Sequence, residues 1–465
     1  MRVFLSIIFL IGLTVANLAQ AALQEFRLDQ DRVWLTADNE PLADLLEQFA
    51  ALGIHVHADP AATTTVSGTW QNMDVETVLQ KIVSPYDYQL DWLREPGPLG
   101  EQTRLTGIRV YRKGFADVAQ PLLSRREIET SPSGRRFLAR EILIGFGPAA
   151  SIDNLRAFLA RSGGTVIHAN TELGVYRIRL PAGANVLSLI DQLGHDKSIV
   201  LAEPNDVYDI QPLLPGQSGG SGAGQWIAPS GDQPIAVSVL DSGLAPNGNL
   251  NQAVISAFDA TQPDSQLTTD PVGHGTLMAQ LAAGLINPFN SPLGEGVPVV
   301  AVKAFMDDGS ADAYTLLSAM THAVNKSTGP ISLSWGSDTP SPIIEGAVRY
   351  AMDKGRLVFA AVGNKNTGKP FYPAAYSGVI GVAASNGDQL ADYSNRGAFV
   401  DLVAPGSAGG SQGTSIATAY VSHIAALYMQ RNPGASAAET TAALKKAAGP
   451  TGFLTESAIQ QLLNK

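Results

Sequence analysis

Short apolar runs alternate with segments of helical periodicity through the C-terminal half of the chain, from Pro234 onward. Strands and helices that alternate in this way build a mainly parallel, doubly wound α/β sheet with helices on both faces. In such sheets, functional side chains gather at the carboxyl ends of the strands. The predicted strands cover residues 235–240, 297–305, 331–335, 357–362 and 379–383, and the predicted helices cover residues 275–285, 313–325 and 342–354.

Four short motifs place polar side chains at the ends of these predicted elements. Asp241 ends the first strand in the order Val-Leu-Asp-Ser-Gly, where a carboxylate can orient an imidazole. His274 opens a predicted helix in Gly-His-Gly-Thr, and Asn364 follows a strand in Val-Gly-Asn. Ser415 opens a long apolar helix in Gly-Thr-Ser-Ile-Ala, so its backbone N–H can donate to a developing anion. Each motif alone also fits an ordinary turn or helix cap.

Taken together and in this order, the four motifs resemble the signature blocks of subtilases, the subtilisin-like serine proteases. The resemblance covers about residues 232–450. It implies a catalytic triad of Asp241, His274 and Ser415, with Asn364 as a donor in the oxyanion hole. Ser415 would attack the peptide carbonyl, and His274 would take its proton and pass it to the leaving amine.

Two further segments resemble the edges of the family's substrate cleft. Gly309 and Ser310 would line one edge, after the strand that ends in Val-Lys-Ala-Phe. Ser334, Trp335 and Gly336 would line the opposing edge, beside the pocket for the residue that precedes the cleaved bond. A protein or peptide substrate would lie extended between these edges and pair with them as an added strand.

Some residues depart from the family pattern. Ala419 and Tyr420 stand where the family usually has a proline and a histidine, and Trp335 replaces a smaller apolar residue. These departures leave an alternative open, a catalytically inactive subtilase-fold adaptor in cell-envelope assembly. A serine esterase is a weaker alternative, because no Gly-x-Ser-x-Gly elbow surrounds Ser415.

Residues 25–115 form a first, smaller unit. Apolar residues at helical spacing predict two helices, and alternating residues predict several short strands, which together give an α+β module. This pattern resembles the short N-terminal domain of secretins and TonB-dependent receptors, and implies a partner protein at the cell envelope. His55 and His57 share one face of a predicted strand, but two ligands without a third make a weak metal site. We therefore expect no metal there.

Residues 137–210 form a second α+β unit, with strands and helices predicted in the order βαββαβ of a ferredoxin-like sandwich. Its place ahead of the protease-like segment resembles the prodomain of subtilases, which acts as a folding chaperone and temporary inhibitor. Residues 211–231 are rich in glycine, serine and proline, as in a flexible linker. We expect the chain to cleave itself within this linker, ahead of a catalytic domain that covers residues 232–465.

Composition excludes several classes of function. The chain has no cysteine, which rules out a thiol nucleophile, thiolate metal sites and disulfides. A net charge of -11 disfavours nucleic acid as a partner, because phosphate binding needs a basic surface. We expect no required cofactor. Calcium stays open as a ligand, although no clear motif indicates a site for it.

The first 21 residues are typical of an export signal. Arg2 precedes an apolar run over residues 3–15, and Ala19 and Ala21 flank a cleavage point. An uncleaved membrane anchor is the alternative. No later segment is apolar for long enough to cross a membrane. The sequence thus predicts an exported protein that is periplasmic, associated with the outer envelope or secreted, and that has no membrane span once the signal is removed.

Overall fold

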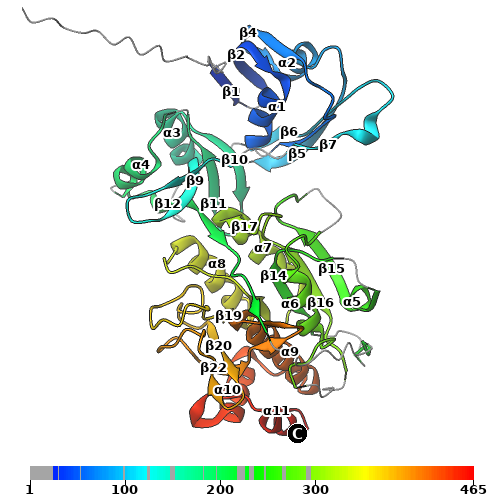
Figure 1. Cartoon of the computed structure of the whole chain (residues 1–465). Coiled ribbons are helices and arrows are strands. Elements are labelled where there is room, and N and C mark those ends of the chain that lie inside the picture. Colours follow the sequence, from blue (N-terminus) through cyan, green and yellow to red (C-terminus); the bar gives the residue numbers. More distant parts are fainter. Residues whose placement is uncertain are drawn as a thin grey trace, which may run out of the picture. The chain divides into compact units, whose positions relative to one another are not determined.

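The computed structural model divides the chain into two compact units at Arg125 and Arg126 (Figure 1). The predicted export signal, residues 1–21, and residues 217–225 of the predicted linker lie outside the described residues. The described residues are 25–29, 31–52, 54–97, 100–122, 126–146, 152–181, 183–194, 196–216, 226–229, 235–245, 248–263, 269–289 and 295–464. Within these ranges, none of the helices has the length and apolar character needed to cross a membrane.

The first unit packs two helices and two small sheets around one core, as its mixed α+β pattern predicts. Asp74 begins the second helix, since its side chain accepts a hydrogen bond from the Thr77 N–H at 3.0 Å. Phe49 and Leu79 are fully buried in the core. The helices are α1 (Leu42–Ala51) and α2 (Val75–Ile82), and the sheets have the orders β1 (Glu25–Asp29), β2 (Arg32–Pro41), β4 (Thr65–Asp74) and β5 (Asp87–Gly97), β6 (Gly100–Tyr111), β3 (His55–Ala58), β7 (Gln120–Pro121).

The second unit begins with the predicted ferredoxin-like order of elements. All pairs in its small sheet are antiparallel, in the order β10-β11-β9-β12. The sheet then continues to β17 (Ser310–Asp312), which belongs to the protease-like part of the chain. The two parts therefore share a sheet and form one compact unit. The elements are β8 (Ile128–Thr130), β9 (Arg136–Phe146), α3 (Ile152–Ser162), β10 (Thr165–Asn170), β11 (Val175–Arg179), α4 (Val186–Leu193) and β12 (Ile199–Asp209).

A largely parallel sheet forms the centre of the remaining chain, which confirms the predicted doubly wound α/β fold (Figure 1). Helices α6 (His274–Ala283) and α9 (Thr414–Arg431) cover one face, and α7 (Ala313–Lys326) and α8 (Pro342–Asp353) cover the other. The strands lie in the order β15 (Val254–Asp259), β16 (Val299–Lys303), β14 (Val237–Asp241), β18 (Ile331–Leu333), β19 (Val358–Ala361), β20 (Ile380–Asn386), and β20 also pairs with β21 (Gln389–Leu390) and β22 (Leu402–Pro405).

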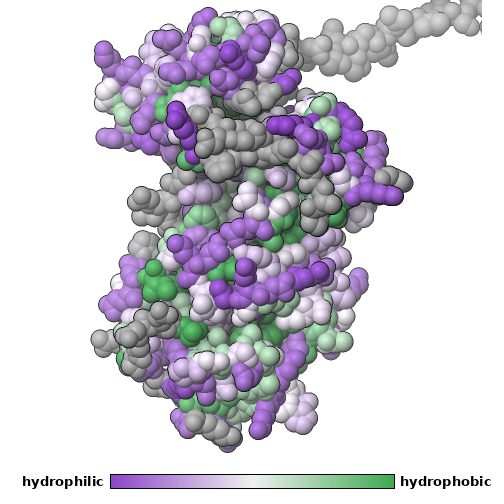
Figure 2. All heavy atoms as spheres, turned by 180° about the vertical axis from the view of Figure 1, so that it is seen from behind, coloured by the Kyte–Doolittle hydropathy of each residue, from purple (hydrophilic) through white to green (hydrophobic). Residues whose placement is uncertain are grey.

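Smaller elements complete this part of the second unit. Three short strands form a separate sheet, and three further helices lie outside the four that cover the main sheet. On the face drawn in Figure 2, hydrophobic side chains appear in patches among hydrophilic ones. The strands are β13 (Leu214–Pro215), β23 (Ser407–Ala408) and β24 (Ser411–Gln412), and the helices are α5 (Gly248–Ala253), α10 (Ala437–Ala448) and α11 (Glu456–Leu463).

Strand β12 of the small domain binds the N-termini of two helices of the protease-like part. Glu203 accepts hydrogen bonds from the Ser341 hydroxyl at 2.6 Å and from the Ile343 N–H at 2.8 Å, at the start of α8. Asn205 accepts one from the Tyr314 N–H at 3.1 Å, at the start of α7. The free N–H groups of a helix N-terminus favour such acceptors. These contacts attach the small domain to both helices on one face of the sheet.

Replacing Glu203 by glutamine should remove a pH dependence of this attachment. Burial raises the pKa of Glu203 to about 7, against the opposing effect of its hydrogen bonds. The ordinary pKa of a glutamic acid is 4.5. The protonated Glu203 side chain therefore contributes fully to stability below pH 4.5, and this contribution is lost as the pH rises through 7. The loss amounts to about 3 kcal/mol, at ~1.4 kcal/mol per pH unit. We expect the free energy of unfolding of E203Q, relative to the parent chain, to rise by about this amount between pH 4.5 and 8.

The measurement is urea unfolding at both pH values, in an S415A background, since Ser415 is the nucleophile that the resemblance to subtilases implies. Buried carboxyls that do not interact with Glu203, such as Asp259, titrate in both proteins and cancel from the comparison. E345Q, at an exposed end of an ion pair on α8, is the control and should show no such trend. A difference between E203Q and its parent that does not vary with pH contradicts the prediction.

Candidate active site

The end of β14 and the start of α6 bring a carboxylate and an imidazole together. Asp241 is the last residue of β14, and His274 is the first residue of α6. The His274 Nδ1 atom lies 2.7 Å from the Asp241 Oδ1 atom, and the two residues are 3% and 1% exposed. A neutral ring that donates its Nδ1–H as a hydrogen bond to the carboxylate keeps its lone pair on Nε2. The pair can therefore act as a base at Nε2.

Ser415 lies in the first turn of α9, but its hydroxyl does not bond to the imidazole. Its Oγ atom donates to the Ser334 carbonyl at 3.3 Å. The His274 Nε2 atom is buried and has no hydrogen-bond partner among the described residues. The structure thus joins two of the three predicted triad members and leaves the third on another acceptor. Catalytic hydrogen bonds are often unformed in the absence of substrate.

Asn364 is held with its donor group free. Its Oδ1 atom accepts hydrogen bonds from the Thr414 N–H and the Thr414 hydroxyl, both at 2.9 Å. Its Nδ2 atom is buried and lacks a partner in the described part of the chain. The amide is therefore oriented by the residue that precedes Ser415. A fixed, unpaired N–H donor next to a nucleophile is what an oxyanion hole requires.

Both predicted edges of the substrate cleft are occupied by the chain itself. Strand β12 pairs antiparallel with β17, which begins at Ser310. The Ile210 N–H then donates to the Gly309 carbonyl at 2.9 Å, and Ile210 also forms a bridge to Trp335 on the opposing edge. Trp335 is fully buried and packs edge-to-face against Tyr208.

The chain next pairs with strand β24, which lies just before Ser415. Leu214 and Pro215 pair with Ser411 and Gln412, and the Gln412 side chain donates to the Pro215 carbonyl at 2.9 Å. We call residues 210–216 the strap. The strap is anchored to the cleft edge at one end and to the segment before Ser415 at the other. Ser415 itself is 0% exposed.

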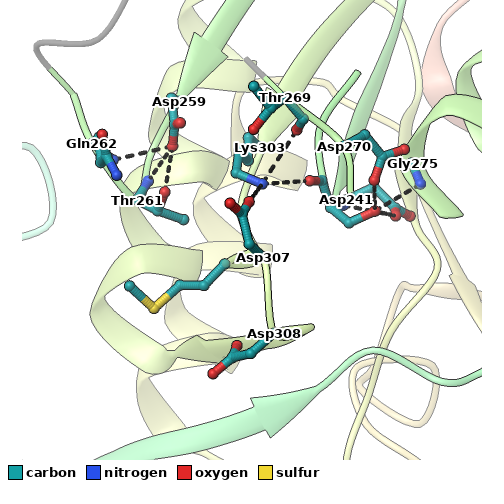
Figure 3. Close-up of polar contacts among 12 residues, drawn as sticks. Asp241, Asp259, Thr261, Gln262, Thr269, Asp270, Gly275, Lys303, Asp307 and Asp308 are labelled. Carbon is teal, nitrogen blue, oxygen red and sulfur yellow. Dashed lines mark hydrogen bonds and ion pairs between the residues drawn. The ribbon is translucent and has the colours of Figure 1, made fainter. Parts of the chain in front are cut away.

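Several polar residues around Asp241 carry no recognisable motif of their own. Lys303, at the end of β16, is only 3% exposed and donates to the backbone carbonyls of Ser242 and Thr269 (Figure 3). Asp270, four residues before His274, accepts hydrogen bonds at the start of α6. The one sequence feature that could have identified this group is a charged residue near the end of a predicted buried strand. This feature identifies Lys303 but none of the residues that it contacts.

The two departures after the nucleophile lie in the core. Ala419 and Tyr420 are 0% and 1% exposed, and Tyr420 packs edge-to-face against Phe289. Burial raises the pKa of the Tyr420 phenol above its ordinary value. Helix α9 runs without a break from Thr414 to Arg431. The substitutions therefore change the packing behind the nucleophile and leave its helix intact.

Comparison with known proteins agrees with this geometry. The model of the subtilase family matches residues 232–463, and that of the fervidolysin N-terminal prodomain matches residues 124–205. A thermophilic serine proteinase from Bacillus sp. strain AK1 is 28% identical over 65% of this chain and 80% of its own length. Subtilisin Savinase from Lederbergia lenta is 33% identical over 47% of this chain and 84% of its own length.

A solved structure extends the likeness to the fold of the smaller domain. The crystal structure of fervidolysin from Fervidobacterium pennivorans, a keratinolytic enzyme related to subtilisin, superposes with a TM-score of 0.58. It covers 72% of this chain and 62% of its own chain at 20% sequence identity. At that identity the superposition shows a shared fold.

Gly243 should not tolerate a side chain. Its φ of +121° is unfavourable for other residues, and a Cβ atom there would lie 1.8 Å from the Thr269 carbonyl oxygen. We expect Gly243→Ala to lower the free energy of unfolding by roughly 3 kcal/mol or more, because backbone strain and a backbone clash coincide. The measurement is urea unfolding of the S415A precursor.

The matched control is Gly346→Ala in the interior of α8. A Cβ atom at Gly346 meets nothing within 4 Å, so this variant should gain about 0.5–1 kcal/mol. Equal effects of the two substitutions would show that the turn after Asp241 is less constrained than its geometry indicates.

Proposed function

Since this chain belongs to the subtilase family of serine proteases, we propose that it hydrolyses peptide bonds with Asp241, His274 and Ser415 as its catalytic triad. The observation that carries the proposal is the 2.7 Å contact between Asp241 and His274, which leaves the Nε2 atom of the ring buried and without a partner among the described residues. That atom is the acceptor that a serine nucleophile needs.

The reaction begins when the Ser415 hydroxyl leaves the Ser334 carbonyl and turns to His274. Its Oγ atom attacks the carbonyl carbon of the substrate while Nε2 takes the hydroxyl proton. The Asn364 Nδ2–H and the Ser415 N–H donate to the oxyanion. His274 then gives the proton to the leaving amine, and an acyl-enzyme forms on Ser415. Water then attacks the acyl carbon while His274 takes a proton from it. His274 passes that proton to Ser415 Oγ as the bond between Oγ and the acyl carbon breaks.

The small domain and the strap support a precursor that is inhibited until it is cleaved. The backbone groups of Gly309 and Trp335 that pair with Ile210 are those that an extended substrate would use. While the strap lies across the site, another peptide has no access to Ser415. We therefore propose self-cleavage after the small domain, within residues 211–231, followed by release of the prodomain, residues 137–210, as a temporary inhibitor together with the chain that precedes it.

The remaining proposals concern location. We propose that residues 1–21 act as a cleaved export signal and that the protein works in the periplasm, at the outer envelope or outside the cell. Relatives with matching catalytic segments include the minor extracellular protease Epr of Bacillus subtilis, of which this chain covers 35%. Residues 25–115 would bind a protein of the cell envelope, on the strength of their α+β pattern. Calcium is not needed by any step derived above.

Replacing Ser415 by alanine should stop self-cleavage. The wild-type chain should yield a mature fragment that begins within residues 211–231, whereas S415A should stay at full length from residue 22. The measurement is mass spectrometry of both proteins purified from cells that lack other major proteases. Ser422→Ala removes a buried hydroxyl from the same helix and should be processed as in the wild type.

Labelling with a fluorophosphonate separates the protease from an inactive adaptor with the same fold. The mature fragment should react at Ser415, and the adaptor should not. Cleavage of S415A at the wild-type position, in the absence of other proteases, would contradict self-processing but leave labelling as an independent test of the triad.

Replacing Asn364 tests the oxyanion hole. Removal of the equivalent donor in subtilisin lowers kcat about 100- to 1,000-fold, and we expect a loss of that order here. Asn364→Asp keeps an oxygen that can accept from Thr414 but lacks the Nδ2 donor. The kcat of N364D should therefore be as low as that of Asn364→Ala, which removes the whole side-chain amide. The measurement is kcat on a peptide p-nitroanilide, and a nearly wild-type kcat for N364D would remove Asn364 from the mechanism.

A further inference from the structure

Ser242, the residue after Asp241, is the centre of a buried hydrogen-bond network. Its Oγ atom accepts the Gly275 N–H at 2.8 Å, in the first turn of α6. The same oxygen lies 2.7 Å from Asp270 Oδ1 and 3.3 Å from Asp241 Oδ1. A hydroxyl has one proton to donate, so it goes to the nearer carboxylate, that of Asp270. Ser242 therefore links helix α6 to a second buried carboxylate.

Asp270 caps the helix that begins with His274. Its Oδ1 atom accepts from the Ser242 hydroxyl and from the Gly273 N–H, the latter at 2.9 Å. Its Oδ2 atom accepts from the Thr276 N–H at 2.7 Å and from the Thr276 hydroxyl at 2.5 Å. The residue at the N-cap position is Gly273, which has no side chain to supply a cap. Asp270 takes over that role from outside the helix.

Lys303 closes the network on its other side. Its Nζ atom donates to the Ser242 carbonyl at 2.8 Å, to the Thr269 carbonyl at 3.2 Å and to Asp307 at 2.9 Å. Figure 3 shows this ammonium group between Asp307 and the side of the network that holds Asp241 and Asp270. The three contacts use all three protons of the group. The Lys303 ammonium group therefore holds the backbone next to Asp241 and the backbone next to Asp270 together.

We infer that Asp270, acting through Ser242, is a positioning residue for the Asp241–His274 pair. The inference rests on the proposed function, since it assumes that this pair is the catalytic base. One carboxylate binds the imidazole directly, and the other fixes the backbone of the helix turn that carries the imidazole. Ser242 joins them, because its backbone N–H donates to Asp241 at 2.8 Å while its side chain serves Asp270.

The network is directed at the imidazole and not at the substrate edges Gly309–Ser310 and Ser334–Gly336. Loss of the Ser242 hydroxyl leaves the Gly275 N–H and one Asp270 oxygen short of a partner, which loosens the first turn of α6. The ring then moves relative to Asp241, and a displacement near 1 Å can cost about 100-fold in rate. Such a change lowers kcat and leaves KM nearly unaltered.

The test compares Ser242→Ala with Ser327→Ala. Ser327 is a matched control at the other end of β14, since its buried hydroxyl donates to the Ala236 carbonyl at 2.7 Å and accepts the Gly329 N–H at 3.0 Å. Each variant loses a buried hydroxyl that donates one hydrogen bond and accepts another. We expect kcat of S242A, per active site titrated with a fluorophosphonate, to fall about 10- to 100-fold with KM within about two-fold. S327A should keep its kcat.

Two more variants connect the effect to the network. Ser242→Thr keeps the hydroxyl and should recover most of the lost kcat. Asp270→Asn presents an NH₂ group to donors that need an acceptor, and should be at least as slow as S242A. The S242A/D270N double variant should be no slower than D270N alone, because both substitutions break one pathway. If S242A does not fold, S242T and D270N still give the comparison with S327A.

The outcomes separate this inference from the proposed function. Equal kcat values for S242A and S327A, with similar losses of stability, would overturn the positioning role of Ser242. Independent, multiplicative effects of S242A and D270N would overturn the link between the two residues. If S415A or H274A hydrolyses the peptide at the wild-type rate, the triad itself is wrong, whatever the Ser242 variants do.

Discussion

A hydrogen bond of 2.7 Å, from the Nδ1 atom of His274 to Asp241, joins the central sheet to the helix beside it. Both residues are almost fully buried, and a buried carboxylate is costly unless hydrogen bonds compensate it. The Oδ1 atom of Asp241 meets this condition with the ring and with the Ser242 N–H at 2.8 Å, while its Oδ2 atom is buried without a partner among the described residues. The bond can form only if β14 ends and α6 begins at one place. The turn at Gly243, too tight for a side chain, makes that possible.

Under the proposed function, the same edge of the sheet serves both substrate recognition and inhibition. Strands β14 and β18 are neighbours, so the segment after β18 places Ser334 against the first turn of α9. The backbone of Gly309 receives Ile210 from the small domain, with the geometry of an added strand. An inhibitor that uses the substrate's own hydrogen bonds is specific without further contacts. In the proposed maturation, the inhibitor would be removed only when the covalent link to the protease is cut and the small domain leaves both helix N-termini.

Much of the fold could be predicted because parallel strands buried on both faces appear as continuous apolar runs. The five predicted strands each overlap an observed one, β14, β16, β18, β19 and β20, and the motifs identified Asp241 and His274 as neighbours. Short edge strands such as β17 and β24 span two or three residues, too few for any periodicity. Lys303 binds backbone carbonyls, which every residue has, so no pattern of side chains in the sequence could predict its partners.

The orientation of Ser415 lies beyond what any motif can predict. Its hydroxyl donates to the Ser334 carbonyl although the motifs predict His274 as its partner, and staggered side-chain rotamers are separated by small free energies. The bond to Ser334, at 3.3 Å, is long for an O–H donor. Meanwhile His274 Nε2 and Asn364 Nδ2 stay buried without a partner among the described residues, at a cost of about 1–3 kcal/mol each. Unsatisfied buried groups are rare and call for a reason. Here one is the acceptor that a serine proton needs and the other is the donor that an oxyanion needs, so both atoms fit roles in the proposed reaction, whereas Asp241 Oδ2, which also lacks a partner among the described residues, has no such role.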